Sequence, residues 1–107
     1  MKRTWFFILL SLADGNRHGS AVMRDVLDLT GGELRLWPAT LYGALDELQD
    51  EGWIEELAGV PDGESERKRY YRITPAGRRA AQAETRRLEQ LVDVARSRTM
   101  SARSRHG

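Results

Sequence analysis

Cysteine is absent from this sequence of 107 residues, which excludes disulfide bonds, thiolate metal sites and a cysteine nucleophile. Histidine is scarce as well, with only His18 and His106. No serine stands in a nucleophile elbow, no glycine-rich phosphate loop precedes a helix, and the acidic residues form no metal-ligand pattern. These absences predict a protein that is not an enzyme and that holds neither a cofactor nor a metal ion. Since a chain without cysteine suits a reducing compartment, we expect a cytoplasmic protein.

Long apolar runs are lacking too. The longest extends from Trp5 to Leu12 and is too short to span a bilayer, which requires about 20 residues. The start of the chain nevertheless imitates a secretory signal, because Lys2 and Arg3 precede the run and small residues follow it. We favour the alternative of a first core helix, since the residues after Ala13 do not make a free-standing fold. The sequence therefore predicts a protein without a membrane partner.

Charge is balanced in total but segregated along the chain. The net charge is +1, yet residues 33–57 hold a single basic residue, Arg35, among many acids, whereas residues 76–107 are rich in arginine. Segregation of this kind decides which face can meet a polyanion. The chain has the length of one small domain, which buries only roughly 60 to 70% of its unfolded surface, so a partner subunit would help to stabilise it.

Turn signals and apolar periodicity predict the order helix, helix, helix, hairpin, long helix. The first helix covers the run that begins at Trp5, and the second starts near Ser20 and stops at two glycines, Gly31 and Gly32. The third begins at Pro38, which suits a first helical position, and ends at Gly52.

Two strands are predicted at 53–57 and 69–73, joined by a stretch rich in glycine, proline and charge. Thr74 and Pro75 then supply a cap and a first helical residue for the last helix. The fold class is α+β, mostly α: a winged helix-turn-helix with a long C-terminal helix. We expect a DNA-binding domain at 1–74, a dimerisation helix at 75–98 and a disordered tail at 99–107.

The helix that starts at Pro38 is the candidate recognition helix, because the second helix of a helix-turn-helix presents its first turns to the major groove. The candidate DNA-contacting residues in it are Pro38, Ala39, Thr40, Tyr42 and Gly43. Small side chains permit close approach to base edges, Thr40 can donate, accept or contact a thymine methyl, and the Tyr42 hydroxyl can reach a phosphate. In the alternative interpretation, Tyr42 is an ordinary half-buried aromatic residue beside core leucines.

The hairpin offers a second candidate contact with DNA. Arg67, Lys68 and Arg69 stand where a wing would lie on the DNA backbone, with Tyr70 as a neighbouring hydrogen-bonding and stacking group. A run of three basic residues is also typical of a solvated face. Four acids on the later turns of the third helix would repel phosphate and must point away from DNA; they are Asp46, Glu47, Asp50 and Glu51.

The last helix carries an apolar stripe that needs a cover. The stripe consists of Leu88, Leu91, Val92 and Ala95. It can pair with the same stripe or with the first helix of a second subunit, or it can pack on its own domain. A two-fold dimer would place two recognition helices about 34 to 36 Å apart and would expect a palindromic operator in double-stranded DNA.

Several motifs together resemble PadR-type transcriptional regulators, over roughly Trp5 to Arg98. These motifs are His18-Gly19, Pro38-Ala39-Thr40-Leu41-Tyr42-Gly43-Ala44-Leu45, Glu51-Gly52-Trp53-Ile54 and Lys68-Arg69-Tyr70-Tyr71-Arg72-Ile73-Thr74. Asp46 and Glu47, where a basic residue is common, and Gly43, where proline is frequent, depart from the pattern.

The resemblance implies a homodimeric repressor that a small ligand releases from DNA. It implies that the last helix contacts the partner's first helix, which adds Trp5, Phe6 and Leu9 to the dimer interface. A single last helix is similar to the short subfamily, in which a cavity near the interface binds flat aromatic compounds, with Trp5 and Phe6 as lining here. Two other hypotheses remain open: a winged-helix protein-interaction module without specific DNA binding, suggested by the acidic third helix, and an exported ligand carrier.

Overall fold

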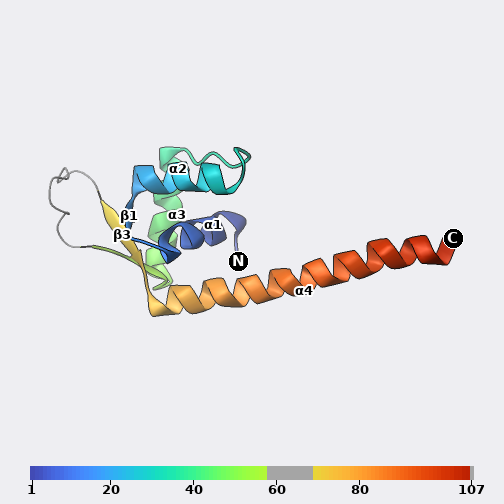
Figure 1. Ribbon diagram of the computed structural model, residues 1–107. Helices are drawn as coiled ribbons and strands as arrows, with labels where there is room; N and C mark the ends of the chain where they lie inside the picture. Colours follow the sequence, from blue (N-terminus) through green and yellow to red (C-terminus); the bar gives the residue numbers. More distant parts are fainter. Residues whose placement is uncertain (58–68, 107) are drawn as a thin grey trace.

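The computed structural model describes residues 1–57 and 69–106, with side chains up to Met100. Its helices and strands follow one another as α1 (Arg3–Ala13), β1 (Arg17–His18), α2 (Gly19–Leu29), α3 (Pro38–Asp50), β2 (Ile54–Glu56), β3 (Tyr70–Ile73) and α4 (Pro75–His106). Three helices gather beside a small sheet, and α4 leaves this body and extends away from it (Figure 1). The predicted winged helix with a long last helix is thereby confirmed.

The core lies where α1, α2 and α3 meet the sheet. Leu41, Leu45 and Leu48 recur at helical spacing on one face of α3 and are fully buried, as the periodicity predicts. Leu9 on α1 is fully buried as well. It packs inside its own subunit and offers no surface to a partner, so its expected place in the dimer interface is wrong. An apolar run such as α1 covers the whole helix circumference, and periodicity cannot tell which residues face inward.

The sheet contains a strand that sequence patterns did not predict. The strand order is β1-β3-β2, and both pairs are antiparallel. β1 has only two residues, which is too short for any alternation of polar and apolar side chains to show. Tyr71 of β3 is fully buried against the helices, and this burial raises its pKa to about 12. The tyrosine therefore stays neutral over the physiological pH range.

Glycine and proline mark the ends of α2 and α3 where the sequence indicated. Gly31 and Gly32 have φ values of 62° and 87° after α2, and Gly52 has a φ of 75° after α3. These are left-handed conformations that other residues adopt at a cost. Pro38 is the first residue of α3, where its missing N–H is not needed.

α4 is fastened to the winged helix at its first turns. The Thr74 hydroxyl donates to the Gly52 carbonyl at 2.6 Å and accepts from the Gly77 N–H at 3.0 Å, so it caps α4 and joins it to the end of α3. Gly77 faces the carbonyl of Trp53 so closely that a Cβ atom there would lie 2.0 Å from the oxygen. Beyond Leu88, every side chain up to Met100 is exposed.

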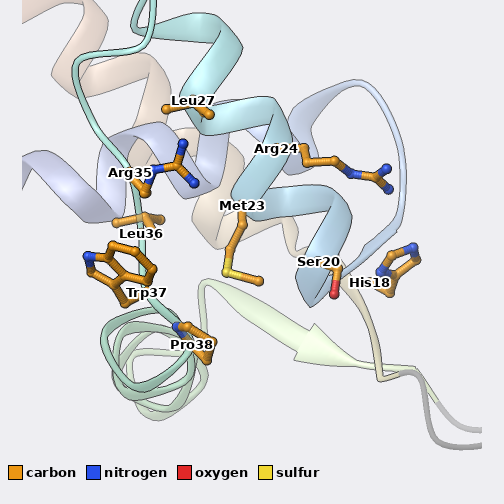
Figure 2. Close-up of a pocket in the computed structure, with 9 residues that line it drawn as sticks. All are labelled: His18, Ser20, Met23, Arg24, Leu27, Arg35, Leu36, Trp37 and Pro38. Atoms are coloured by element: carbon orange, nitrogen blue, oxygen red, sulfur yellow. The ribbon is translucent and has the colours of Figure 1, made fainter.

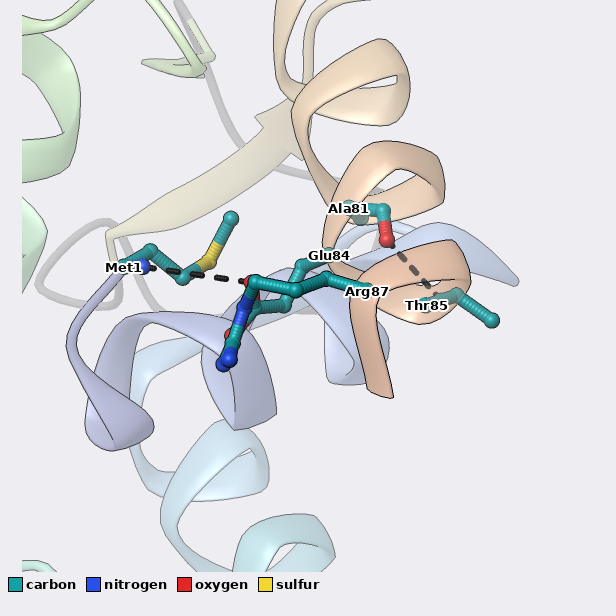
Figure 3. Close-up of polar contacts among 5 residues, drawn as sticks. All are labelled: Met1, Ala81, Glu84, Thr85 and Arg87. Atoms are coloured by element: carbon teal, nitrogen blue, oxygen red, sulfur yellow. Dashed lines mark hydrogen bonds and ion pairs between the residues drawn. The ribbon is translucent and has the colours of Figure 1, made fainter. Parts of the chain in front are cut away.

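The N-terminus of the chain also meets α4. The Met1 ammonium group lies 3.9 Å from the Glu84 carboxylate, which pairs with Arg87 at 2.7 Å one turn later (Figure 3). The Arg87 hydrogen bond lowers the pKa of Glu84. Thr85 donates to the Ala81 carbonyl within the same turns. The contact from Met1 joins the N-terminus to α4, and the other two contacts lie within α4.

α4 continues to His106, whereas the sequence analysis ended it at Arg98 and expected a disordered tail. Residues 99–106 bring little to bury, which suggested fraying, but they include no proline or glycine to stop a helix. In the described residues, no helix is long and apolar enough to cross a membrane.

Candidate nucleic-acid interface

The first turns of α3 present a face of small side chains. Pro38, Ala39, Thr40 and Gly43 are exposed, while Leu41 between them is fully buried. No acidic residue stands in the first turn. A helix N-terminus has free N–H groups and a partial positive charge, which suit an approaching anion. The structure therefore exposes four of the five residues predicted on this helix.

Tyr42, the fifth residue, is half-buried between helices. A Cβ atom on Gly19 would lie 2.5 Å from its hydroxyl oxygen, so glycine at position 19 makes room for the ring. The Arg69 guanidinium lies 5.8 Å from the ring centroid. His18, next to Gly19, accepts a hydrogen bond from the Ala21 N–H and caps α2. The pattern of His18, Gly19 and Tyr42 thus fixes how α2 meets α3, as the packing interpretation of Tyr42 proposed.

Of the three cations predicted for the wing, the structure describes one, Arg69, and it is paired with a carboxylate. Arg67 and Lys68 lie outside the described residues. Arg69 donates to Glu56 at 2.5 Å, which lowers the pKa of Glu56 and raises that of the guanidinium. Arg72 forms an ion pair with Glu55 on the same two strands. These arginines are neutralised across the sheet, which a count of charges along the sequence could not reveal.

Tyr70 is only 8% exposed, with its ring edge against the ring of His18 at a centroid distance of 5.4 Å. Because its ring is buried against His18, the structure does not offer the ring of Tyr70 for stacking, and its expected contact with DNA stays a prediction. A strand of four residues that is flanked on both sides buries three of its side chains, and sequence position alone did not place Tyr70 among them.

The four acids of α3 are placed in three ways, and Asp46 is exposed about one turn after Gly43, without an ion pair in the described residues. Glu47 accepts a hydrogen bond from Lys2 at 2.9 Å, and this contact lowers the pKa of Glu47. Its carboxylate is therefore paired with the residue that precedes α1. Asp50 and Glu51 stand at the far end of the helix, about 18 Å from Pro38 at 1.5 Å per residue.

A cleft of about 610 Å³ opens between α2 and the start of α3 (Figure 2). Apolar side chains and two arginines line it, together with a histidine and a serine, and no acidic residue is among the lining. The lining residues are His18, Ser20, Met23, Arg24, Leu27, Arg35, Leu36, Trp37 and Pro38. Trp37 is 65% exposed although it is a large aromatic residue. Sequence reasoning missed Arg24 and Arg35 because neither has another basic residue beside it in the sequence.

A second, smaller groove of about 360 Å³ lies between α1 and α4. It brings together three residues of the predicted dimer interface, Phe6, Leu88 and Val92. Leu91 is 55% exposed on α4. Trp5 packs edge-on against Trp53 at a centroid distance of 5.6 Å. The groove therefore unites part of the predicted interface, on an otherwise uncovered helix.

Comparisons with known proteins agree with this architecture. Transcriptional regulator Rv3488 of Mycobacterium tuberculosis is 37% identical over 85 residues, which are 79% of this chain and 75% of that protein. A transcriptional regulator from Clostridium thermocellum has a similar structure, with a TM-score of 0.74 and 26% identity, covering 88% of this chain and 87% of the other.

Bacillus subtilis PadR, solved in complex with operator DNA, has a TM-score of 0.68 and covers 78% of this chain and 47% of the other. Because its identity is 21%, that likeness concerns the fold. The model of the transcriptional regulator PadR-like family matches residues 8–83, which include the second half of α1, all of α2 and α3, the sheet and the first turns of α4. The chain belongs to the PadR-like family of transcriptional regulators.

Proposed function

We propose that the protein is a homodimeric repressor that binds a palindromic operator through the first turns of α3. The observation that carries this proposal is the exposed face of small residues at the start of α3, whose first turn contains no acidic residue. Members of the family are DNA-binding regulators rather than enzymes, and the related PadR of Bacillus subtilis has been solved with operator DNA. In this role, Thr40 reads a base edge, while Pro38, Ala39 and Gly43 permit the close approach.

The dimer in this proposal forms through α4. Leu91 and Val92 are exposed large apolar side chains that share one face of α4 with Leu88 and Ala95, and exposed apolar patches of this kind mark interaction surfaces. The partner's α4 lies along this face, beside the groove that Phe6 forms with Leu88 and Val92. A two-fold axis through this interface places two recognition helices about one DNA turn apart, which requires a palindromic site.

The ligand response is assigned to the same end of the molecule. A flat aromatic compound held beside Phe6 and the neighbouring Trp5, near the dimer interface, changes the angle between the two subunits and releases the operator. Support comes from the groove of about 360 Å³ at Phe6, which adjoins the proposed interface. A ligand that binds there shifts the protein only as far as its affinities for the two arrangements differ.

The test is a gel shift of the purified protein with DNA from its own upstream region, against unrelated DNA, over a range of salt concentrations. Specific and salt-sensitive binding with two subunits per site is expected. Thr40→Ala is expected to weaken specific binding about fivefold, equivalent to about 1 kcal/mol, and to leave binding to unrelated DNA unchanged. Binding without sequence preference at low salt would overturn the proposal and favour the protein-interaction module.

Gly43→Ala is a control that separates folding from DNA contact. A Cβ atom at Gly43 meets nothing within 4 Å, and alanine stabilises an exposed helical position by about 0.5 to 1 kcal/mol relative to glycine. The variant is therefore expected to unfold at a higher temperature. A loss of operator affinity in this more stable protein shows that the added methyl group meets DNA.

A further inference from the structure

Ion pairing sorts the basic residues of the winged helix into two groups. Residues 1–57 and 69–74 hold seven arginines and lysines. Five of them have a carboxylate partner within 4.0 Å, namely Lys2, Arg3, Arg17, Arg69 and Arg72. Within this described part of the chain, Arg24 and Arg35 have no such partner. A carboxylate beside a cation reduces the attraction of that cation for a phosphate, so Arg24 and Arg35 are the leading candidates for an anion contact there.

Both unpaired arginines line the cleft between α2 and α3. Arg24 lies at one side, near His18, and Arg35 at the other, with Met23 between them (Figure 2). The acid closest in sequence to Arg35 in the loop, Glu33, pairs with Arg3 at 3.8 Å. Ser20, in the first turn of α2, adds a hydroxyl and a helix N-terminus to the same wall. The cleft is a positively charged, acid-free strip beside the first residue of α3.

We propose that this cleft holds the sugar-phosphate backbone of one DNA strand, with Arg24 and Arg35 contacting separate phosphates. This inference rests on the proposed DNA binding and adds residues that bind the DNA backbone. Arg69 of the predicted wing does not fill this role, because it is paired with Glu56. Phosphate contacts of this kind fix the position of a recognition helix without reading sequence.

The spacing of the charges favours a strand over a small anion. The two guanidinium groups stand on opposite sides of an open cleft instead of converging on one point. A strand carries a phosphate at every nucleotide and can meet both groups at once. Trp37 lies between Arg35 and the start of α3, with its ring 5.8 Å from the Arg35 guanidinium. An indole that is 65% exposed beside a cation supplies an apolar and stacking surface for a sugar or base.

The test compares two double variants that lose the same charge. Arg24→Gln with Arg35→Gln removes the proposed contacts. Arg79→Gln with Arg86→Gln removes two exposed arginines of α4 that lack an ion pair in the described chain, and serves as the control. The affinity for operator and for unrelated DNA is measured between 50 and 200 mM salt, after circular dichroism has shown that each variant is folded.

The cleft variant is expected to weaken binding to both DNAs alike and to reduce the slope of log affinity against log salt by about 1.8, or about 0.9 per phosphate contact. The control variant is expected to keep the wild-type slope. An unchanged slope in the cleft variant would overturn the backbone contact and leave the proposed function intact. Absence of DNA binding by the wild-type protein would overturn the proposed function itself.

A second experiment distinguishes a DNA strand from a small anion as the occupant of the cleft. Inorganic phosphate is titrated into the wild-type protein while tryptophan fluorescence is followed, with Trp37→Phe to assign the signal. Saturable binding of phosphate that the cleft variant abolishes, together with an unchanged salt slope for DNA, would overturn the proposal in favour of a small-anion site. A salt slope that falls as stated supports the DNA strand.

Discussion

The winged helix and the second half of α4 are built in opposite ways. In the winged helix, α1, α2, α3 and the sheet share one core whose largest side chains are fully buried. From position 89 to 100 of α4, every side chain is exposed, including Leu91 at 55% and Val92 at 46%. Isolated helices gain little stability in water, and most helical stability in proteins comes from packing. The comparison teaches that one region carries its stabilising contacts within the chain, whereas the other leaves its apolar side chains exposed.

The largest change in stability is expected from a substitution in the core of the winged helix. Leu45 is fully buried in the core, and Leu45→Ala is expected to lower the free energy of unfolding by about 2 to 5 kcal/mol through lost burial and a residual cavity. The measurement is urea unfolding followed by circular dichroism. A loss below about 1 kcal/mol would contradict the view that this core holds the domain together.

A second variant tests where the two regions meet. Gly77→Ala places a methyl group against the backbone carbonyl of Trp53, which cannot move away as a flexible side chain can. Overpacking of this kind typically costs about 1 to 3 kcal/mol. Gly15→Ala is the matched control, because its Cβ meets nothing within 4 Å. Equal thermal stability of the two variants would show that α4 is not pinned at its first turns.

The exposed half of α4 should respond differently from the core. Leu91→Ser with Val92→Ser is expected to change the unfolding free energy of the monomer by about 0.5 kcal/mol or less, because both side chains are exposed. The same change is expected to reduce the particle mass from two chains to one and to remove the dependence of melting temperature on protein concentration.

Leu29→Ser is the control for this experiment, since Leu29 is also a half-exposed leucine but lies on α2. It is expected to leave the particle mass of the wild-type protein unchanged. Sedimentation velocity at several protein concentrations gives both masses. A dimer that survives the α4 substitutions would place the interface elsewhere on the molecule.

The smallest effect concerns pH. Hydrogen bonds from Lys2, Arg69 and Arg87 lower the pKa values of Glu47, Glu56 and Glu84 respectively. A carboxyl group whose pKa is lower in the folded state stabilises the fold above its unfolded pKa, and this stabilisation is lost as the pH falls through the folded value. The melting temperature is therefore expected to decrease below about pH 4.5.

Glu56→Gln sharpens this test, because it removes one of the carboxyl groups that titrate and should make the decrease shallower. Glu89→Gln on the exposed half of α4 is the control, since Glu89 forms no ion pair within the described chain. Differential scanning calorimetry between pH 7 and pH 3 measures both. Parallel curves for wild type and Glu56→Gln would contradict a stabilising role for the pair with Arg69.

Sequence patterns predicted the elements whose signals are local. Pro38 and Gly52 bounded α3, and Thr74 with Pro75 opened α4, because caps and special backbone angles depend on one or two residues. β1 was missed because a strand of two residues has no pattern of its own and exists through its pairing with Tyr70 and Tyr71.

The candidate site was predicted less well than the fold, because it too depends on contacts between residues that are distant in the sequence. Small residues at the start of α3 are recognisable in the sequence, and the structure exposes them. Whether a charge is available depends on partners distant in the chain. Arg69 is neutralised by Glu56 across the sheet, while Arg24 and Arg35 are not paired with any described carboxylate. A count of charges along the sequence therefore emphasised the wing and missed the cleft.

The Thr74 side chain bonds to the end of α3 and to the first turn of α4, and so joins the two helices. α4 has 32 residues and is about 48 Å long at 1.5 Å per residue. A small change in the direction of α4 at Thr74 is therefore amplified at its C-terminal end. A tilt of about 5° displaces that end by about 4 Å over the length of the helix. In the proposed dimer, a displacement of a few ångströms where two α4 helices meet would therefore change the orientation of each α3 helix by only a few degrees.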